Sequence, residues 1–546
     1  MGLPFRAVSI VAAGVGFVLS SDIVAIPGLP KVGFAAGFLA AWTFQFWLWA
    51  FWAVILHPHY FSPLRHLPSP TGGSFYNGQW KKISAQPSGV PMIEWINSIP
   101  NNGIIRYLGL LNLERVMVTS PKALAEVLST KCYDFQKPEQ LRWSLGRILG
   151  VGILFAEGDE HNIQRRKLLP AFSFRHIKDL YPVFWDKSRE SVRVMTSAVL
   201  ADPVLEVGSW ASRATLDMIG VAGLGRDFGA IENPSNTLSQ TYHNLFKPSA
   251  QGRLLGLVSL FIPGWLVEKL PVQRNNDVRH AVRVVRSVCS DLIQTSKQKR
   301  SSGEQPSLDI ISVALESGSF TDENLVDQMM TFLLAGHETT ASSMTWACYL
   351  LAKHPDIQSR LRSEIHARLP PIDSSTPITS LDIDSLPYLN AVCQEIFRYF
   401  APVPLLMRDA ARDTTIQGTF IPKGTRVIIS PWAVNKSVEM WGPDAAEFNP
   451  DRWLASGDAE KDKKAASGGA SSNYAFMTFL AGPRGCIGRE FAKAEFACLL
   501  AAWVGRFKME LGDGMEKDEE KLDIKGAITA RPEGGMFIKM EVVEGW

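Results

Sequence analysis

The sequence predicts a mainly α-helical protein with a small β-sheet region, preceded by one or two N-terminal transmembrane segments. After residue 120, apolar residues recur every three or four positions along most of the chain, which is typical of amphipathic helices. Alternating apolar and polar residues, which indicate strands, occur only in short runs. A run of 25 residues without a charge, residues 32–56, precedes all of these patterns.

The uncharged run at residues 32–56 predicts a membrane-spanning helix, because a crossing needs about 20 apolar residues. Indole side chains gather toward its C-terminal half, and such rings favour the headgroup region of a bilayer. These residues are Trp42, Trp47, Trp49 and Trp52. The alternative is a buried core helix, which is less common for so long an uncharged run.

An earlier apolar run, residues 7–21, is shorter and rich in Gly, Ala and Ser. Three interpretations stay open for it: a first crossing, an interfacial segment or a signal peptide. If both runs cross, the N-terminus and the main domain lie on the same side of the membrane. If the first is a signal peptide, the second stops transfer, and the main domain again stays in the cytosol. The flanking charges are too sparse to fix the orientation alone.

We divide the chain into a membrane anchor at residues 1–56, a Pro/Gly-rich hinge at residues 57–78 and a single domain at residues 79–546. The hinge cannot continue a helix, because it is interrupted by Pro58, Pro63, Pro68, Pro70, Gly72 and Gly73. Length alone suggests three or four domains at about 150 residues each. One large domain fits better, because motifs that serve one site lie more than 300 residues apart.

Periodicity also places the elements of this domain. A hairpin is expected at residues 105–118, where glycine breaks a loosely alternating run. Helices are expected at residues 121–128, 188–200, 213–224, 278–297, 322–353, 356–367, 388–399 and 489–507. Further strands are expected at residues 415–421, 426–430 and 536–543. Residues 300–307 and 456–472 are polar, low-complexity insertions that we expect to be mobile.

Charge and cysteine content exclude several classes of protein. The chain has 56 basic and 54 acidic residues, a net charge of +2, which gives no electrostatic footprint for nucleic acid. Neither C-x-x-C nor H-x-x-x-H occurs, so zinc sites and iron–sulfur clusters lack their ligand spacing. The cysteines show no disulfide spacing either, which favours a reducing compartment. They are Cys132, Cys289, Cys348, Cys393, Cys486 and Cys498.

One of these cysteines, Cys486, lies in a loop that leads directly into the helix expected at residues 489–507. Glycines and a proline in the loop allow tight backbone turns close to a flat ligand. At a helix N-terminus, free N–H groups and partial positive charge stabilise a thiolate, and a single thiolate suits haem iron. Without further context, a lone cysteine before an amphipathic helix is more often a small core residue.

The full loop pattern, F-x-x-G-x-R-x-C-x-G at residues 479–488, is much more restrictive. It resembles the haem loop of the cytochrome P450 superfamily, in particular of fungal-like, membrane-anchored microsomal members. The resemblance covers nearly everything from about residue 72 to the end and implies the cytochrome P450 fold, with residues 79–546 as a haem-thiolate catalytic domain. It implies haem b with Cys486 as the axial ligand of the iron. The loop residues that contact the cofactor would be Phe479, Gly482, Arg484 and Gly488.

Basic residues elsewhere resemble the groups that hold the haem propionates in this family. His161 and Arg165 lie four positions apart and so on one helical face, where they could meet an anionic ligand. Such a pair alone is more often a solvated basic face. A Trp commonly stands in the family where this chain has His161, so the family pattern supports Arg165 but not His161. After two prolines, Arg408 matches an arginine near a propionate.

The long helix expected at residues 322–353, with Thr321 as its N-cap, contains a polar patch at residues 335–340. Gly336 would let the backbone approach a ligand, and the Thr339 hydroxyl can bond back to the main chain and loosen the helix locally. Without context, this patch would be only a polar helix face. It resembles the oxygen-activating motif of the family, with Glu338 as the acid and Thr339 as the alcohol. At Ala335, where some fatty-acid hydroxylases carry a glutamate bonded to haem, this chain has no carboxylate, so we expect non-covalent haem.

Glu395 and Arg398 form an i, i+3 pair on a helix, and Arg452 follows in a later loop. Helical Glu/Arg pairs are usually surface features. Together these three residues resemble the buried triad that braces the haem loop in the family. Their expected role is structural.

The resemblance implies a monooxygenase that takes electrons from NADPH through the FAD and FMN of a separate NADPH–cytochrome P450 reductase, with cytochrome b5 as an optional second partner. The expected location is the endoplasmic reticulum membrane, with the catalytic domain on the cytosolic side. Two rivals stay open: a reductase-independent haem-thiolate isomerase or dehydratase, and a non-enzymatic haem sensor. The acid–alcohol pair argues against the first.

The segments expected to line the pocket are apolar, so recognition by hydrophobic burial is expected. They predict a bulky hydrocarbon substrate, such as a terpenoid, a steroid-like compound or a polyketide-derived intermediate of specialised metabolism. A fatty acid is the second choice. The lining residues are Leu145, Ile148, Leu149, Val151, Ile153, Leu154, Phe155, Phe332, Leu333, Val403, Leu405, Leu406, Met407 and Ile528. Arg142 and Arg147 could meet a carboxylate at the mouth, although loop arginines are more often solvated.

Overall fold

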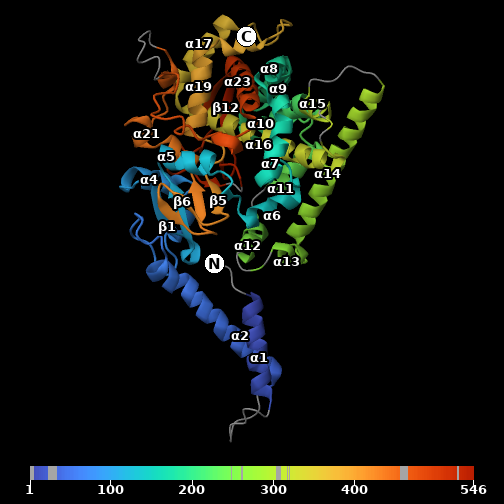
Figure 1. Ribbon diagram of the computed structural model, residues 1–546. Helices are drawn as coiled ribbons and strands as arrows, with labels where there is room; N and C mark the ends of the chain where they lie inside the picture. The colour runs from blue at the N-terminus through green and yellow to red at the C-terminus, as the bar shows by residue number, and fades with distance from the viewer. Residues whose placement is uncertain are drawn as a thin grey trace.

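The computed structural model describes residues 5–21, 33–246, 249–259, 262, 264–302, 309–316, 318, 320–455, 465–525 and 528–546. A mainly helical body with small sheets carries two slender N-terminal helices that project from it (Figure 1). The predicted fold class is therefore confirmed. Residues 303–307 and 456–464 of the two expected insertions lie outside the described residues.

The long helices of the body coincide with the predicted ones. The helix predicted at residues 322–353 is α16, Asp322–Lys353, and Thr321 caps it by accepting the Asn324 N–H. The other α-helices of the body are α3 Trp80–Ala85, α4 Val90–Ser98, α5 Pro121–Ala125, α6 Glu139–Leu149, α7 Gly158–Leu168, α8 Phe174–Asp179, α9 Tyr181–Ala201, α10 Val207–Met218, α11 Thr237–Phe246, α12 Ala250–Val258, α13 Gly264–Lys269, α14 Gln273–Ser301, α15 Ile310–Glu316, α17 Pro355–Arg368, α18 Ser380–Asp384, α19 Pro387–Tyr399, α20 Pro431–Asn435, α21 Val438–Trp441 and α23 Arg489–Arg506.

Shorter helical turns extend or connect these helices. The 3₁₀ turns are η3 Leu110–Asn112, η5 Leu169–Phe172, η7 Pro450–Trp453 and η8 Gly482–Arg484. The π-type turns are η2 Trp52–Phe61, η4 Glu126–Thr130 and η6 Ile219–Gly223. Two of them, η4 and η6, prolong α5 and α10, so the helices predicted at residues 121–128 and 213–224 are confirmed with a change of winding.

Four small sheets complete the described part of the body. The largest has the strand order β1-β2-β8-β5-β3, in which β2 and β8 run parallel and the other neighbours antiparallel. The strands are β1 Ile104–Leu108, β2 Glu114–Val118, β3 Phe135–Gln136, β4 Val204–Glu206, β5 Leu406–Ala410, β6 Thr414–Ile416, β7 Thr419–Ile421, β8 Arg426–Ile429, β9 Phe507–Leu511, β10 Ile524–Lys525, β11 Arg531–Pro532 and β12 Phe537–Val542. The predicted hairpin at residues 105–118 is β1-β2, whereas the strand predicted at residues 415–421 is itself a hairpin, β6-β7, turning at Gln417 and Gly418.

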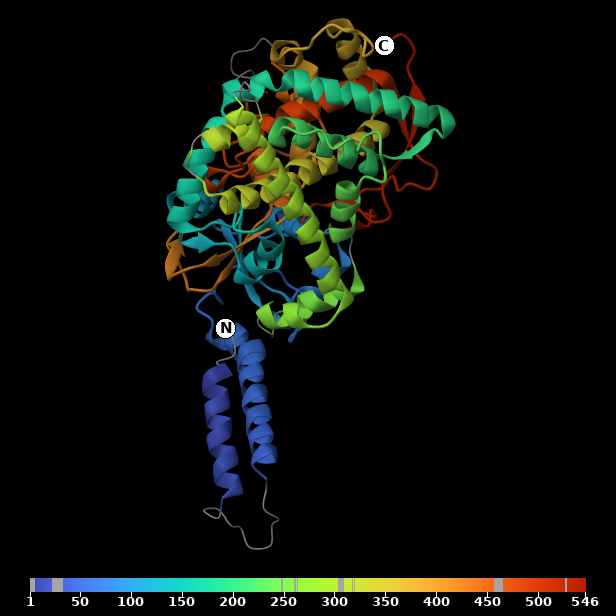
Figure 2. The ribbon, with the colours of Figure 1, turned by 90° about the vertical axis from the view of Figure 1, so that its right-hand side faces the viewer.

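The core is built around α16, which is buried over most of its length. It packs against α10, α14, α19 and α23, and α23 packs in turn against α9. Figures 1 and 2 show α16 passing through the middle of the helical layer. A helix that neighbours cover on all sides can present functional groups only to an internal space.

The two N-terminal helices, α1 Phe5–Ser20 and α2 Phe34–Phe51, form an antiparallel hairpin below the body (Figure 2). They touch at Gly16 and Gly37, where a Cβ on Gly16 would lie 2.9 Å from the Phe38 nitrogen. From Phe34 to Phe61 the chain is helical, long and apolar enough to cross a membrane. The helix continues through Pro58, which we expected to break it, because the π-type winding of η2 accommodates the proline.

Candidate active site

The loop before α23 is built as its sequence suggests. The Cys486 N–H donates to the Phe479 carbonyl at 2.8 Å, and the Gly485 N–H donates to the Gly482 carbonyl at 3.0 Å. Gly482 has a φ of +71°, and a Cβ there would lie 2.2 Å from the Leu128 carbonyl oxygen. Glycine is therefore required at position 482 by both conformation and space.

Cys486 is exposed, whereas the other five cysteines are buried. Burial among surrounding groups nevertheless raises the pKa of its thiol, an effect that the Gly488 N–H and the cations Arg165 and Arg489 oppose. The residue is thus accessible although protein groups surround its sulfur. Since α23 begins at Arg489, Cys486 lies just before a helix N-terminus, as predicted.

Basic side chains gather beside this loop, and they come from distant segments. Arg165 in α7 donates to the Gly485 carbonyl at 2.7 Å, so it is directly tied to the cysteine loop. Arg484 forms an ion pair with Glu157 and lies over the Tyr133 ring. Arg408 in β5 is 4% exposed, yet it donates only to the carbonyl of its neighbour Met407, and within the described residues it has no carboxylate partner. Such buried, uncompensated charge fits an anionic group of a ligand.

His161 belongs to the same cluster but is neutral. Burial, with the nearby cations Arg484, Lys137 and Arg165, lowers the pKa of His161 to about 4. Its Nδ1 lies 3.4 Å from the Tyr133 hydroxyl. The side chain can therefore bond to a propionate only as a neutral donor.

The sequence analysis missed Lys137, which lies between β3 and α6. Burial and the neighbouring Arg408 lower the pKa of this lysine to about 7. Its signal in the sequence is weak, since a single lysine before a proline is ordinary. Only the fold brings it to Arg408, which lies 271 positions later in the chain.

Glu338 and Thr339, the predicted acid and alcohol of α16, have different hydrogen-bond partners. The Thr339 hydroxyl donates to the Ala335 carbonyl at 2.7 Å, which is the predicted bond back to the main chain. Both Thr339 and Ala335 are partly accessible, while most of the helix is buried. Glu338 bonds instead to the segment before and within β11: its Oε1 accepts from Thr529 at 2.8 Å, and its Oε2 pairs with Arg531 at 2.7 Å.

Gly336 lies at a close packing contact. A Cβ on Gly336 would lie 2.8 Å from the Ile219 side chain in η6. The expectation that this glycine opens the backbone to a ligand stays a prediction, because the missing Cβ faces Ile219. The glycine lets α16 lie close to the end of α10.

The predicted brace is present as a fully buried network. Glu395 accepts hydrogen bonds from Arg398 Nε and Nη2, both at 2.8 Å, and from Arg452 Nε at 3.1 Å. The Asn449 N–H and the Trp453 indole also donate to it, at 2.8 and 2.9 Å. Burial alone would raise the pKa of Glu395, but its hydrogen bond to Arg398 and the two arginine charges lower it overall.

Asn435, which the sequence did not single out, connects this brace to the cysteine loop. Its amide donates to the Arg398 carbonyl at 3.0 Å and to the Thr478 hydroxyl at 2.9 Å, and its oxygen accepts the Met477 N–H at 2.7 Å. Thr478 directly precedes Phe479. The brace therefore connects to the start of the loop through this amide side chain, and the Thr478 hydroxyl also donates directly to the Phe397 carbonyl in α19, at 2.6 Å.

A second carboxyl that sequence reasoning missed, Glu495, lies in α23 and is fully buried. Neither of its oxygens meets hydrogen-bond geometry with a described residue. Burial raises the pKa of Glu495 well above its usual range, and the nearby Thr340 hydroxyl offsets only part of this effect. Burial therefore favours the protonated form of this carboxyl.

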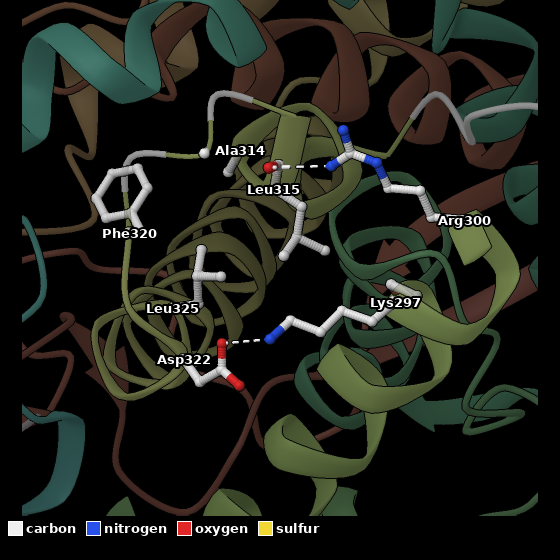
Figure 3. A pocket seen from close by; sticks show the side chains of 9 residues that line it. Lys297, Arg300, Ala314, Leu315, Phe320, Asp322 and Leu325 are labelled. Carbon is white, nitrogen blue, oxygen red and sulfur yellow. Dashed lines mark hydrogen bonds and ion pairs between the residues drawn. The ribbon is translucent and has the colours of Figure 1, made fainter.

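A cavity of about 200 Å³ lies elsewhere, between the end of α14, α15 and the start of α16 (Figure 3). None of the predicted site residues lines it. Its cations are engaged, since Lys297 pairs with Asp322 at 2.5 Å and Arg300 donates to the Leu315 carbonyl at 3.4 Å. We assign no ligand to this cavity.

Comparison with known proteins agrees with this geometry. The family model described as Cytochrome P450 matches residues 102–538. The chain is 46% identical to the cytochrome P450 monooxygenase sphH of Aspergillus fumigatus, covering 90% of this chain and 91% of that one. It is 44% identical to the monooxygenase ALT8 of Alternaria alternata, over 91% and 93%, and 43% identical to FUM15 of Gibberella moniliformis, over 90% of each. The chain therefore belongs to the cytochrome P450 family of haem-dependent monooxygenases.

Proposed function

We propose that this protein inserts one atom of dioxygen into a bulky hydrophobic substrate of specialised metabolism. The observation that carries the proposal is the accessible Cys486 in a glycine-rich loop to which basic side chains converge from distant segments. We place the partly accessible Thr339 and Ala335 of α16 in the same site. Such an arrangement would suit an anionic, planar, iron-containing cofactor and a proton donor.

The residues present fit haem b, the cofactor of the family. Cys486 would hold the iron, Phe479, Gly482 and Gly488 would shape the loop against the ring, and the propionates would meet Arg408, Arg484, Arg165, Lys137 and neutral His161. Arg408 and Lys137 support this assignment most strongly, because each is a desolvated cation whose pKa burial has lowered. An anion beside them would remove that penalty.

When bound, the haem supplies the iron chemistry that activates dioxygen. The chain itself supplies position and protons. In the proposal, Thr339 holds a hydrogen-bonding hydroxyl in the helix beside the cofactor, and Glu338 brings protons from the surface side to it. A positioned proton transfer of this kind contributes about 10² to 10⁴ in rate.

For the substrate, we propose a terpenoid, steroid-like or polyketide-derived compound, with a fatty acid as the alternative. Leu145, Leu154 and Ile528 are only partly buried and pack against the main core, which suits contact with an apolar ligand. Arg147 donates through Nη1 to Asn275 at 3.3 Å and lies over Trp143, and its Nε has no partner among the described residues. Arg142 and Arg147 therefore keep the fatty acid open as the alternative.

We further propose that the protein lies in the endoplasmic reticulum membrane with both α1 and α2 across it. Close packing through small residues is typical of helix pairs in lipid, and Ala12, Gly16 and Gly37 are buried at this contact. Two crossings would put the N-terminus and the catalytic domain on the cytosolic side, where NADPH–cytochrome P450 reductase and cytochrome b5 would reach it. Tags at both ends should then be digested together in intact microsomes, and protection of the N-terminal tag alone would contradict the hairpin topology.

The enzymatic proposal is tested with the full chain and a reductase in membranes. The reduced protein with carbon monoxide should show the band that gives the family its name, and Cys486→Ala should lose it. Apolar candidates should cause a saturable spectral shift and an NADPH-dependent gain of oxygen. Product formed without NADPH would instead support the reductase-independent isomerase, and the absence of both shift and turnover would support a sensor.

A further inference from the structure

The Glu338 carboxylate is held by two residues that lie 191 and 193 positions further along the chain. Thr529 Oγ1 donates to Oε1 at 2.8 Å, and Arg531 Nη2 pairs with Oε2 at 2.7 Å and approaches the Glu338 carbonyl at 3.4 Å. Thr529 is 4% exposed, and the side chains of Glu338 and Arg531 are 14% and 30% exposed. Both oxygens of the acid are therefore engaged in a mostly buried setting.

The segment that holds Glu338 is itself fixed to α16. The Ala530 carbonyl accepts from the Ser342 hydroxyl and from the Trp346 indole, both at 2.9 Å, and the Ala530 N–H donates to Pro402 at 2.8 Å. Glu338, Ser342 and Trp346 are four positions apart, so they form one stripe of the helix. Three contacts that do not involve the acid thus hold the segment with Thr529 and Arg531, so we expect the segment to stay in place when one of them, that of Ser342, is lost.

This geometry separates the acid from the alcohol next to it. Thr339 donates to the Ala335 carbonyl, and Glu338 bonds to Thr529 and Arg531. To move a proton, Glu338 must take it from solvent on the Arg531 side, turn toward Thr339, deliver it and return as a carboxylate. A partner that keeps the carboxylate oriented, and compensates its charge when it returns, is therefore part of the cycle.

We propose that Thr529 and Arg531 are positioning residues for proton delivery: they hold Glu338 between transfers and limit how far it turns. This inference rests on the proposed role of Glu338 and Thr339 and extends it to the C-terminal segment. Arg531 provides the counter-charge, and Thr529 fixes the carboxylate orientation. Without these two residues, the Glu338 carboxylate can turn but no longer points reliably toward Thr339. Proton delivery then fails more often, and electrons from NADPH are released as hydrogen peroxide.

The test compares Arg531→Gln and Thr529→Val with the control Ser342→Ala, in the full-length protein with reductase in membranes. Ser342→Ala removes a contact between the same segment and α16 but leaves Glu338 untouched. Peroxide released per NADPH is measured without substrate and with the steroid progesterone as a bulky probe. The solvent deuterium isotope effect on NADPH oxidation, haem content and thermal stability are measured in parallel.

In Arg531→Gln and Thr529→Val, we expect the fraction of NADPH that is used without forming peroxide to fall about tenfold. This is smaller than the factor of about 10² to 10⁴ in rate that positioned proton transfer contributes, because Glu338 itself remains. The isotope effect should change as well, while haem content stays normal. Ser342→Ala should behave like the unmodified protein in both measures. Unchanged peroxide yield in the first two variants, or an equal rise in Ser342→Ala, would overturn the inference.

The variant Glu338→Gln distinguishes a failure of this inference from a failure of the proposed function. If it raises the peroxide yield and the Thr529 and Arg531 variants do not, the acid acts without these partners, and only this inference fails. If Glu338→Gln has no effect either, the proton-delivery part of the proposed function fails with it.

Discussion

Replacing Glu395 by alanine should strongly destabilise the protein, although this residue lies behind the proposed haem site. The change removes a buried carboxylate that accepts five hydrogen bonds and leaves the charge of Arg398 inside the protein. Breaking a buried ion pair from one side typically costs about 3–5 kcal/mol. Arg398 keeps three carbonyl acceptors, at Asn435, Ala445 and Glu447. We therefore expect the loss in free energy of unfolding to lie at the lower end of this range, at about 3 kcal/mol.

The reverse change, Arg398→Ala, should cost more, because those three carbonyl oxygens also lose their donor. The matched control is Glu232→Gln, which breaks an ion pair with Arg193 at 2.5 Å whose side chains are 58% and 67% exposed. An exposed pair contributes about 0–1 kcal/mol. Urea unfolding of the detergent-solubilised full chain, followed by tryptophan fluorescence and haem absorbance, measures all three variants. A loss in Glu395→Ala no greater than in Glu232→Gln would refute the reasoning.

The same group gives a pH dependence with a defined sign. The pKa of Glu395 is lower in the folded protein than its usual value of 4.5. Its stabilising contribution is therefore complete above about pH 4.5 and is lost as the pH falls through the folded pKa. Acid-induced haem release should follow this loss, and Glu395→Gln should make release less dependent on pH in that range.

Three further predictions concern Lys137, Glu495 and the anchor. Lys137→Met should weaken haem retention about tenfold, through loss of an ion pair worth about 1.4 kcal/mol in a partly desolvated setting; transfer of haem to a haem-scavenging globin measures this. Because the pKa of Lys137 is about 7, haem affinity of the unmodified protein should also fall as the pH rises above 7. The affinity of the variant should not fall in this way. Glu495→Gln should leave stability unchanged at pH 5 and increase it at pH 8. The pKa of Glu495 is higher in the folded protein than its usual value of 4.5, so the unmodified protein loses stability as the pH rises above 4.5, and the variant does not. A difference in the free energy of unfolding between the two proteins that is the same at both pH values would contradict this. Gly16→Leu should separate α1 from α2, detected as loss of disulfide cross-linking between cysteines placed at positions 8 and 45, whereas Gly14→Leu, at a position with open space, should leave it intact.

The sequence could point to those parts of the candidate site that are local in the chain. The cysteine loop, α7 with His161 and Arg165, and the patch in α16 each lie within about ten residues, so the resemblance to the family could single them out where spacing alone could not. Their roles at the site stay predictions. Lys137, Asn435 and Arg531 could not be found in this way, because each acts through a partner hundreds of positions distant or through a main-chain carbonyl. The packing contact of Gly336 could not be foreseen for the same reason: its neighbour Ile219 lies in another helical segment.

Different neighbours contact different faces of α16 and leave a small part of this buried helix accessible. One face, at Gly336 and His337, is fixed by Ile219 and by the Thr215 hydroxyl, which donates to the His337 carbonyl at 3.0 Å. A second face bonds to Ala530 of the C-terminal segment, and a third meets α23 near Thr340. These contacts leave Ala335 and Thr339 accessible, so any ligand in that space touches a helix that its neighbours hold rigidly. A turn of the Glu338 carboxylate would break none of these contacts, because that carboxylate bonds to Thr529 and Arg531 instead.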